Sequence, residues 1–495
     1  METIRDLLSA GGDDATALVN VEGESLTYRD LRERVGALSD QLRSQGVGPS
    51  DRIAIVLPNG PEMALAFLAA THAGCAAPLN PKYRESEFRF YLEDLKAKIL
   101  ITPDGGHPEA EAAAGEDVVK VAALGHMGSL KFRGDKSIQS HGGAQPGRDD
   151  GALVLHTSGT TSRPKIVPLR QCNLVASAGN VAASLSLDES DRSLNVMPLF
   201  HIHGLVAGLL APLAAGGSVI CTPGFEAFKF HGWIDQLRPT FYSAVPTMHQ
   251  MVLARGGEPH ATTLRFVRSS SASLPAAVRD GLHRLFGVPV IEAYGMTEAS
   301  HQMASNPLPP GRSKPGSVGR ATGIELAILG QDWSARSPGQ RGEVSVRGQT
   351  IVSAYENNEE ANNSSFNEEG WFRTGDEGYL DSDGFLFLTG RLKEQINRGG
   401  EKVVPLEIDE VLMSHPDVAQ AVAFALPDPV LGEDVAAAVV LREGTEVSAS
   451  DLRSYASTYL AAFKVPRHVF FVEEIPKGPT GKVQRIGLAK ALGVE

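Results

Sequence analysis

Apolar and polar positions alternate in short blocks through the first hundred residues. Residues 52–57 form an apolar run of strand length that is closed by a Pro-Asn-Gly turn, and residues 98–102 repeat this buried-strand pattern. Between them, residues 61–74 are typical of a helix, and Thr27 is a typical cap for an earlier amphipathic helix that runs toward Leu42. Strands that alternate with helices indicate an α/β fold of layered sheets and helices with parallel strands.

The pattern changes after residue 391. Two helices and two strands follow within ~100 residues, a size that can fold alone, so we expect a small α+β C-terminal domain beside a large N-terminal one. Residues 103–148 are rich in Gly, Ala and acidic residues, which predicts an irregular surface segment. The expected C-terminal elements are a helix at 405–414, strands at 418–425 and 436–441, and a helix at 448–460.

Composition narrows the class of protein. The chain has 495 residues, 42% hydrophobic and 21% charged, as in globular rather than disordered proteins. The formal net charge of −13 disfavours a general nucleic-acid binder, and the three isolated cysteines offer neither a metal-ligand spacing nor a disulfide framework.

The N-terminus lacks the apolar region of a secretory signal, and the longest apolar run, residues 205–215, contains Pro212 and is too short to span a membrane. We therefore expect a cytoplasmic location.

Residues 155–165 form the most informative segment. Five hydroxyl side chains, a glycine and a lysine follow the strand-like residues 152–155. Hydroxyls and free backbone amides in a glycine-bearing turn make a concavity that can wrap a polyphosphate, and Lys165 adds a positive charge. The segment is not a Walker loop, because Gly-Lys-Ser/Thr is absent. Taken alone, a solvated Ser/Thr loop is the alternative interpretation.

Four further segments favour nucleotide chemistry when they are taken together. Residues 294–298 present an aromatic ring, a hydroxyl and a carboxylate, which suit a base, a phosphate and Mg²⁺. Residues 371–376 end with an acid after a glycine, which suits two ribose hydroxyls. Residues 390–394 and 479–484 add an arginine and a lysine next to glycine turns. Each could be a surface turn alone, but their order and spacing together are not expected by chance.

In these motifs the chain resembles, over essentially its whole length, the adenylate-forming enzymes, a superfamily that includes acyl-CoA synthetases, luciferases and peptide-synthetase adenylation domains. The resemblance implies an acid–CoA ligase that uses ATP and Mg²⁺ to form an acyl-adenylate and then transfers the acyl group to coenzyme A. It also implies individual roles. The phosphate loop would consist of Thr157, Ser158, Gly159, Thr160, Thr161 and Lys165. Adenine would lie at Tyr294 and Gly295, a phosphate at Thr297 and Mg²⁺ at Glu298, and the ribose or a phosphate would be bound by Asp376 and Arg391. Lys482 would bridge the attacking carboxylate and the α-phosphate.

The same resemblance implies a division of the chain. An N-terminal nucleotide and substrate domain would cover residues 1–391, a hinge residues 392–393, and a mobile C-terminal domain residues 394–495. Lys393 matches the hinge position, where changed backbone angles would turn the small domain after adenylation. The coenzyme A contacts implied on the turned domain are Gly399, Gly400 and Lys402.

The residues expected around the acid are polar. In 4-coumarate–CoA ligases, small apolar residues stand where this chain has Ser270 and Ser271, and a Gly-Pro pair stands where it has Ser300 and His301. His203 is expected on the opposite wall. Buried hydroxyls and imidazoles need hydrogen-bond partners, so they suit a short dianion better than an aliphatic tail.

The motif around His301 and residues 246–251 and 397–402 are very similar to those of oxalate–CoA ligases, and this resemblance implies oxalate as the acid. The alternatives are another short or aromatic acid, such as malonate or a cinnamate, a peptide-synthetase adenylation module, and a non-catalytic nucleotide-binding relative. An amine-binding aspartate is not evident where His203 stands, which disfavours the module. The histidines could also serve only structure, by capping strands or bonding backbone carbonyls.

We predict that Lys482→Ala removes acyl-adenylate formation and spares thioester formation from a pre-made adenylate. The lysine charge is needed only while the carboxylate meets the α-phosphate, and losing such a contact costs about a hundred-fold or more in rate. Pyrophosphate release measures the first step, and consumption of coenzyme A with synthetic adenylate measures the second. Equal losses in both steps would show that Lys482 serves structure or the whole reaction.

Overall fold

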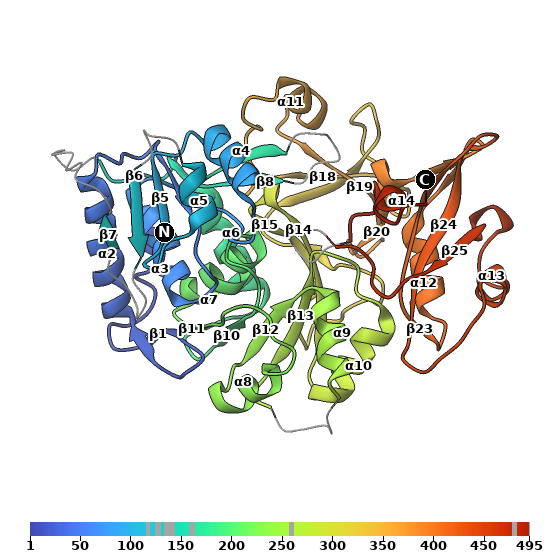
Figure 1. Cartoon of the computed structure of the whole chain (residues 1–495), viewed down its shortest axis with the longest axis horizontal. Helices are drawn as coiled ribbons and strands as arrows, with labels where there is room; N and C mark the ends of the chain where they lie inside the picture. Colours follow the sequence, from blue (N-terminus) through green and yellow to red (C-terminus); the bar gives the residue numbers. More distant parts are fainter. Residues whose placement is uncertain are drawn as a thin grey trace.

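A computed structural model describes residues 1–114, 119–123, 130–132, 144–157, 164–256, 262–477 and 483–494. Three sheets with their helices form the larger part of the molecule, and a fourth sheet forms a smaller C-terminal part at one end, orange and red in Figure 1. In the described part of the chain, no helix is both long and apolar enough to cross a membrane.

A nine-stranded sheet runs through the middle of the larger part (Figure 1). Its central strands are parallel, and antiparallel strands close both edges. From edge to edge the strands are β16 (Arg320–Ala321), β15 (His301–Ser305), β14 (Val290–Met296), β13 (Phe266–Ser270), β12 (Phe241–Ala244), β10 (Arg192–Asn195), β11 (Ser218–Cys221), β1 (Thr16–Val19) and β2 (Ser25–Thr27).

A seven-stranded sheet has the same plan, with a parallel centre and one antiparallel strand at each edge. Its strands are, in order, β7 (Leu130–Phe132), β6 (Val119–Ala123), β5 (Ile99–Pro103), β3 (Arg52–Ile55), β4 (Cys75–Pro78), β8 (Gly151–Thr157) and β9 (Lys165–Arg170).

Helices pack between and around these two sheets. One large hydrophobic core joins side chains of both sheets, such as Ile55 and Phe266, to the helices between them. Burial of these apolar surfaces is the main stabilising force that holds the sheets together. The helices are α1 (Ile4–Leu7), α2 (Tyr28–Ser44), α3 (Pro61–Ala73), α4 (Glu85–Leu95), α5 (Pro108–Ala113), α6 (Gln171–Ser184), the π-helix η1 (His203–Leu210), α7 (Ala211–Ala214), α8 (Phe230–Leu237), α9 (Pro246–Ala254), α10 (Ala276–Phe286) and the 3₁₀ turn η2 (Thr297–Ala299).

A four-stranded antiparallel sheet follows in the chain. It places Asp376 and Arg391 opposite each other on neighbouring strands, and it ends at the last residue before the C-terminal part. Its elements are β17 (Glu325–Leu329), β18 (Gly342–Arg347), β19 (Phe372–Leu380) and β20 (Leu386–Arg391), with α11 (Glu359–Ser365) between β18 and β19.

The C-terminal part is built on a long hairpin with hydrophobic cores on both faces of its sheet. Arg485 joins the two ends of this part, because its Nε lies 3.1 Å from Glu394 Oε2 and its Nη2 lies 2.7 Å from Asp409 Oδ2. Its elements are the 3₁₀ turn η3 (Leu392–Glu394), β21 (Ile396–Arg398), β22 (Glu401–Val403), α12 (Pro405–Met413), β23 (Val418–Asp428), β24 (Gly432–Leu441), α13 (Ala449–Ser457), the 3₁₀ turn η4 (Ala462–Lys464), β25 (His468–Phe471) and α14 (Leu488–Ala491).

The α/β architecture of a large N-terminal and a smaller C-terminal domain is confirmed. Thr27 caps α2 as expected, with a reciprocal pair of hydrogen bonds to Asp30. The expectation of an irregular segment at residues 103–148 was wrong in part, because α5, β6 and β7 come from it, and β6 and β7 extend the seven-stranded sheet. Short edge elements of three to six residues show little periodicity in sequence, which explains the miss. The hinge at residues 392–393 stays a prediction, and it coincides with η3.

We predict that Lys393→Pro slows thioester formation far more than adenylation. Proline fixes φ near about −65°, so it should hold the hinge in one setting. The matched control is Lys393→Ala, which removes the charge and keeps the backbone freedom. Separate assays of pyrophosphate release and thioester formation measure the two steps. Equal behaviour of the two variants would place the rotation elsewhere in the chain.

Candidate active site

Three residues predicted to bind the nucleotide form one cluster, in which Tyr294 and Arg391 contact the buried carboxylate of Asp376. Tyr294, in β14, donates its hydroxyl to Oδ2 of Asp376, in β19, at 2.5 Å. Arg391, at the end of β20, lies with Nε 3.0 Å from Asp376 Oδ1. Half of the Arg391 side chain stays exposed, so the guanidinium can also contact a ligand. The cluster therefore gathers residues from two sheets, and its last member, Arg391, directly precedes η3.

The Asp376 carboxylate changes the pKa values of both of its partners in this cluster. Burial, together with the Asp376 carboxylate, raises the pKa of Tyr294 well above its ordinary value, so the phenol stays protonated and donates. The same carboxylate raises the pKa of Arg391, which stays positive. An aromatic ring, a carboxylate and an exposed cation at one point can serve a base, a ribose and a phosphate.

A second cluster surrounds Glu298 in η2. The hydroxyl of Tyr355 donates to Glu298 Oε1 at 2.9 Å, and Lys165 Nζ lies 4.2 Å from the centre of the Tyr355 ring. Tyr355 follows β18 and was not singled out in the sequence, because nothing local to it signals a contact with η2. It links two of the predicted site residues, Lys165 and Glu298.

Glu298 has the environment expected of a Mg²⁺ carboxylate. Burial raises its pKa, while the Tyr355 hydroxyl and the nearby positive charges of Lys165 and Arg391 oppose that rise. Among the described residues no group of three or more His, Cys, Asp or Glu side chains gathers around a possible metal position. Mg²⁺ is commonly held by one or two carboxylates plus substrate phosphates, so a single buried carboxylate fits this ion.

The phosphate segment is partly defined. Thr157 and Lys165 pair across the β8–β9 ladder, which holds the two ends of the segment together. Burial and, to a smaller extent, the positive charge of Lys393 lower the pKa of Lys165, while the Glu298 carboxylate opposes this change, so Lys393 lies within electrostatic reach of Lys165. Ser158, Gly159, Thr160, Thr161 and Lys482 lie outside the described residues, and their roles stay predictions.

A third cluster contains the residues predicted to bind the acid. The rings of His203, which opens η1, and His301, which opens β15, stack with centres 4.9 Å apart and planes at 22°. His203 Nδ1 lies 3.2 Å from Ser271 Oγ, and its Nε2 lies 2.7 Å from Ser243 Oγ. The structure thus brings His203, His301 and Ser271 together from three distant segments.

Arg268, in β13, completes this cluster and was missed as a site residue. It is fully buried, and it donates to Ser243 Oγ at 2.8 Å and to Gln302 Oε1 at 2.9 Å. Burial lowers its pKa to about 9, so it remains positively charged at neutral pH. A signal was present in the sequence, since a charged residue in the middle of the otherwise uncharged run 266–270 is unusual for a buried strand.

The acid cluster also holds an unsatisfied hydroxyl and unusual backbone. Ser270 Oγ is buried without a hydrogen-bond partner in the described part of the protein, and Ser270 lies on the same face of β13 as Arg268. Ser271, Ser300 and His301 all have positive φ, at 76°, 53° and 107°. Such angles are uncommon for residues other than glycine and concentrate at functional sites.

Gly295 joins the nucleotide and acid clusters. A Cβ atom at Gly295 would lie 1.8 Å from the carbonyl oxygen of His301, and the β14–β15 ladder is irregular at this point. Only glycine permits this approach, which brings His301 next to the strand that carries Tyr294. Gly295 was predicted as a nucleotide residue, and its packing role was not foreseen. Thr297 lies in η2 beside Glu298.

The predicted coenzyme A residues lie in the C-terminal domain. Gly399 and Gly400 form the exposed turn between β21 and β22, with φ of 59° and 97°, and the Gly399 amide donates to the Leu431 carbonyl at 2.9 Å. Lys402 is exposed on β22. The contacts of these residues with coenzyme A stay predictions.

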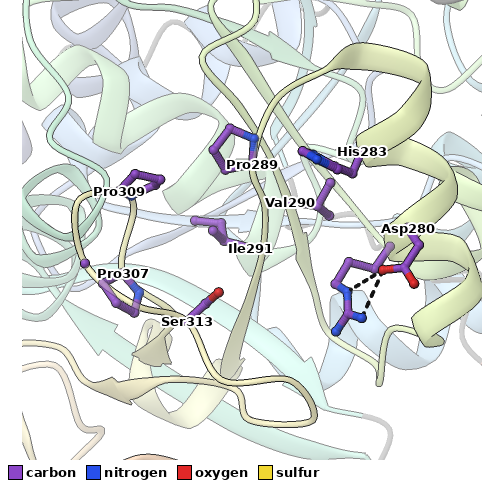
Figure 2. Close-up of a pocket in the computed structure, with 10 residues that line it drawn as sticks. Asp280, His283, Pro289, Val290, Ile291, Pro307, Pro309 and Ser313 are labelled. Atoms are coloured by element: carbon purple, nitrogen blue, oxygen red, sulfur yellow. Dashed lines mark hydrogen bonds and ion pairs between the residues drawn. The ribbon is translucent and has the colours of Figure 1, made fainter.

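A surface pocket of about 220 Å³ lies beside β14, between α10 and the loop at residues 307–313 (Figure 2). Its charged pair, Arg279 and Asp280, is bonded internally at 3.0 Å. His283 Nδ1 lies 2.9 Å from the Val288 carbonyl oxygen. None of the predicted site residues lines this pocket, so the three polar clusters remain the candidate active site.

Comparison with protein families gives two matches. The AMP-binding enzyme family model matches residues 9–356, and the AMP-binding enzyme C-terminal domain model matches residues 407–482. The first match covers the polar clusters up to Tyr355, and the second begins after η3.

Three curated relatives are named for small acids with two anionic groups. The oxalate–CoA ligase of Arabidopsis thaliana is 46% identical over 94% of this chain and 94% of its own length. The oxalate–CoA ligase of Saccharomyces cerevisiae is 40% identical over 97% and 94%. The sulfoacetate–CoA ligase of Cupriavidus necator is 37% identical over 94% and 92%.

Solved structures with bound nucleotide share the fold. ATP-bound MatB from Rhodopseudomonas palustris superposes with a TM-score of 0.90 at 28% identity, over 99% of this chain and 98% of its own. The o-succinylbenzoate CoA synthetase of Bacillus subtilis, in complex with ATP and a magnesium ion, has a TM-score of 0.84 at 30% identity, over 99% of both chains.

We predict that Tyr355→Phe weakens the use of Mg·ATP. The variant removes the hydrogen bond to Glu298. A hydrogen bond to a charged group contributes about 1.5–3 kcal/mol, which corresponds to a change of roughly ten- to a hundred-fold in rate or affinity. The measurement is pyrophosphate release as a function of Mg²⁺ concentration. Tyr379→Phe is the matched control, because the Tyr379 ring, in β19, stacks on Phe387 of β20. An unchanged Mg²⁺ dependence in Tyr355→Phe would contradict the role given to this hydroxyl.

Proposed function

The chain belongs to the AMP-binding enzyme family and is an AMP-forming acid–CoA ligase, and we propose that oxalate is its acid substrate. The proposed reaction converts oxalate, ATP and coenzyme A to oxalyl-CoA, AMP and pyrophosphate. The observation that carries the choice of acid is the cluster of His203, His301 and Ser271 around a buried arginine.

The first step is adenylation. An oxalate carboxylate attacks the α-phosphate of ATP, the bond to pyrophosphate breaks, and oxalyl-AMP forms. Both reactants are anions, so fixed positive charges aimed at the α-phosphate supply much of the rate. In the proposal Lys482 provides this charge between the carboxylate and the phosphate, Lys165 and the phosphate segment hold the leaving pyrophosphate, and Thr297 contacts a phosphate.

The nucleotide is held by the two clusters near the end of β14. Tyr294 packs against the adenine, Asp376 accepts from the ribose hydroxyls, and Arg391 contacts ribose or phosphate. Glu298 would hold Mg²⁺, which when bound balances the charge of the phosphates. The Tyr355 hydroxyl orients the Glu298 carboxylate for this task.

The second step is thioester formation. The thiol of coenzyme A attacks the acyl carbon of oxalyl-AMP, the acyl–phosphate bond breaks, and AMP leaves with the electron pair. Rotation at Lys393 withdraws Lys482 and brings the turn at Gly399 and Gly400, with Lys402, to the adenylate. The proposed reaction therefore uses ATP, Mg²⁺ and coenzyme A, the last as a co-substrate. The proposed location of the enzyme is the cytoplasm.

The acid cluster suits a short dianion. An aliphatic or aromatic acid would leave the Ser270 hydroxyl and the Arg268 charge facing apolar surface, and unpaired buried polar groups are costly. Oxalate has two carboxylates and no carbon chain, so one carboxylate can face the nucleotide while the other accepts hydrogen bonds. Malonate, another short acid or a cinnamate-like acid is the alternative within the family, and a peptide-synthetase-type adenylation module is the less favoured one.

We predict that oxalate gives the highest kcat/KM in a panel of oxalate, malonate, sulfoacetate, acetate, octanoate and 4-coumarate. Longer acids should be poor substrates because the polar floor cannot be satisfied by methylene groups. Formation of AMP that depends on both the acid and coenzyme A is the measurement. A clear preference for octanoate or 4-coumarate would exclude oxalate and leave the ligase activity in place.

The same panel tests the acid residues. His203→Ala and His301→Ala should each lower kcat/KM for oxalate by about ten- to a hundred-fold, the usual cost of removing a donor to a buried anion, with little change in the KM for ATP. His283→Ala is the matched control, because His283 lies at the separate pocket beside α10. A parallel loss of ATP affinity in the two site variants would show that these histidines serve structure.

A further inference from the structure

Arg268 is an unusual residue for the centre of a sheet. It lies in β13 between β12 and β14, with no exposed surface, and among the described residues it forms no ion pair with a carboxylate. A buried charge without a counter-charge is strongly unfavourable, and such groups are retained where a ligand supplies the missing charge. Arg268 thus leaves an uncompensated positive charge beneath His203 and His301.

The contacts of Arg268 are with neutral groups. One guanidinium nitrogen, Nη1, lies 2.8 Å from Ser243 Oγ and 3.4 Å from His203 Nε2. The other, Nη2, lies 2.9 Å from Gln302 Oε1 and 3.2 Å from His301 Nε2. The guanidinium therefore spans both histidines, one with each arm.

These contacts decide which imidazole nitrogens carry protons. A guanidinium can only donate, so His301 Nε2 must accept and must be unprotonated. Arg268 Nη1 also donates toward His203 Nε2 at 3.4 Å, so this nitrogen accepts as well, and the Ser243 hydroxyl, 2.7 Å from the same nitrogen, then donates to it. A neutral imidazole that accepts at Nε2 carries its proton at Nδ1.

The stacking of the two rings agrees with neutral histidines. Their centres are 4.9 Å apart, and two imidazolium ions at that distance beside a guanidinium would place three positive charges together in a buried site. With Nε2 of His203 bound by donors, its Nδ1–H donates toward Ser271 Oγ at 3.2 Å, and the Ser271 hydroxyl proton is left for a further acceptor.

We propose that Arg268 is a positioning residue that holds His203 and His301 as neutral Nδ1–H tautomers, so that His301 donates directly, and His203 donates through the Ser271 hydroxyl, to the second carboxylate of the acid, whose negative charge balances the guanidinium. This inference rests on the proposed oxalate activity for the identity of the acid. The tautomer assignment concerns the protein alone, so the two can fail separately. Arg268 acts through the histidines, which explains why full burial does not prevent it from setting the preference for a dianion.

The first test needs no variant. Enzyme labelled with ¹⁵N-histidine shows in two-bond ¹H–¹⁵N correlation spectra which ring nitrogen is bare, and His203→Ala and His301→Ala assign the two sets of signals. The expected result is a bare Nε2 and a protonated Nδ1 for both residues. Protonated Nε2 in either ring, or two protonated rings, in the free enzyme at neutral pH would overturn the inference.

The second test uses Arg268→Met and Arg268→Lys, with Arg265→Met as the matched control. Arg265 lies in the same segment, but it pairs with Asp191 at 2.5 Å and does not contact the acid cluster. Arg268→Met should raise the KM for oxalate by about ten- to a hundred-fold while the KM for ATP is unchanged, and it should remove the Nδ1–H signature of His301. Arg268→Lys keeps the charge but not the two-armed contact, so it should also lose the His301 signature and should retain part of the oxalate affinity.

The outcomes separate the two proposals. Retention of the His301 signature in both folded Arg268 variants, or equal losses in Arg265→Met, would overturn the positioning role. If the enzyme shows the signature and loses it in Arg268→Lys, yet prefers another acid in the panel, the role of Arg268 stands and the oxalate assignment falls. If Arg268→Met does not fold, the spectra of the unaltered enzyme and of Arg268→Lys still decide the inference.

Discussion

The buried carboxylate of Asp376 is the group on which the arrangement of the site depends. It accepts the Tyr294 hydroxyl from the nine-stranded sheet and pairs with Arg391, the last residue before η3. A buried charge is tolerated only when its partners are in place, so the two sheets and the start of the C-terminal domain must meet in one geometry. The same interaction therefore fixes the end of β20, after which η3 begins, and the residues of the proposed nucleotide site.

From that point the site divides into two ends of opposite electrostatic character. The nucleotide end has a buried carboxylate, Glu298, whose charged form is favoured by cations nearby. The proposed acid end has a buried guanidinium, Arg268, whose pKa is lowered by its burial. The reversal from β14 into β15 carries Glu298 and, a few residues later, His301, which contacts Arg268, and Gly295 makes the close packing of that reversal possible. In the proposed function an enzyme that joins a small anion to a nucleotide uses both environments, and this reversal places their strands side by side.

Local patterns predicted the fold where they were strong. The Thr27 cap and the apolar run at residues 52–57 predicted α2 and β3 because each is decided by neighbours in the chain. The edge strands β6 and β7 were missed because a short edge strand needs little periodicity and is stabilised by the sheet beside it. Tyr355 was missed for a similar reason, since its partner Glu298 is distant in the chain and adjacent only in space.

The sequence by itself determined the chemistry that the protein can carry out. The order of the phosphate segment, the motif at residues 294–298 and the acid at Asp376 indicated a family, and the hydroxyls and imidazoles near Ser270 and His301 indicated a polar acid pocket. Only the tertiary structure decided how those groups work together. Pairing of β13 with its neighbours places Arg268 within about 3 Å of groups from β12 and β15, and a hydrogen bond forms or fails over a few tenths of an ångström. Residue types limit which bonds are possible, but donor, acceptor and proton position depend on distances that only the packed sheets and helices set.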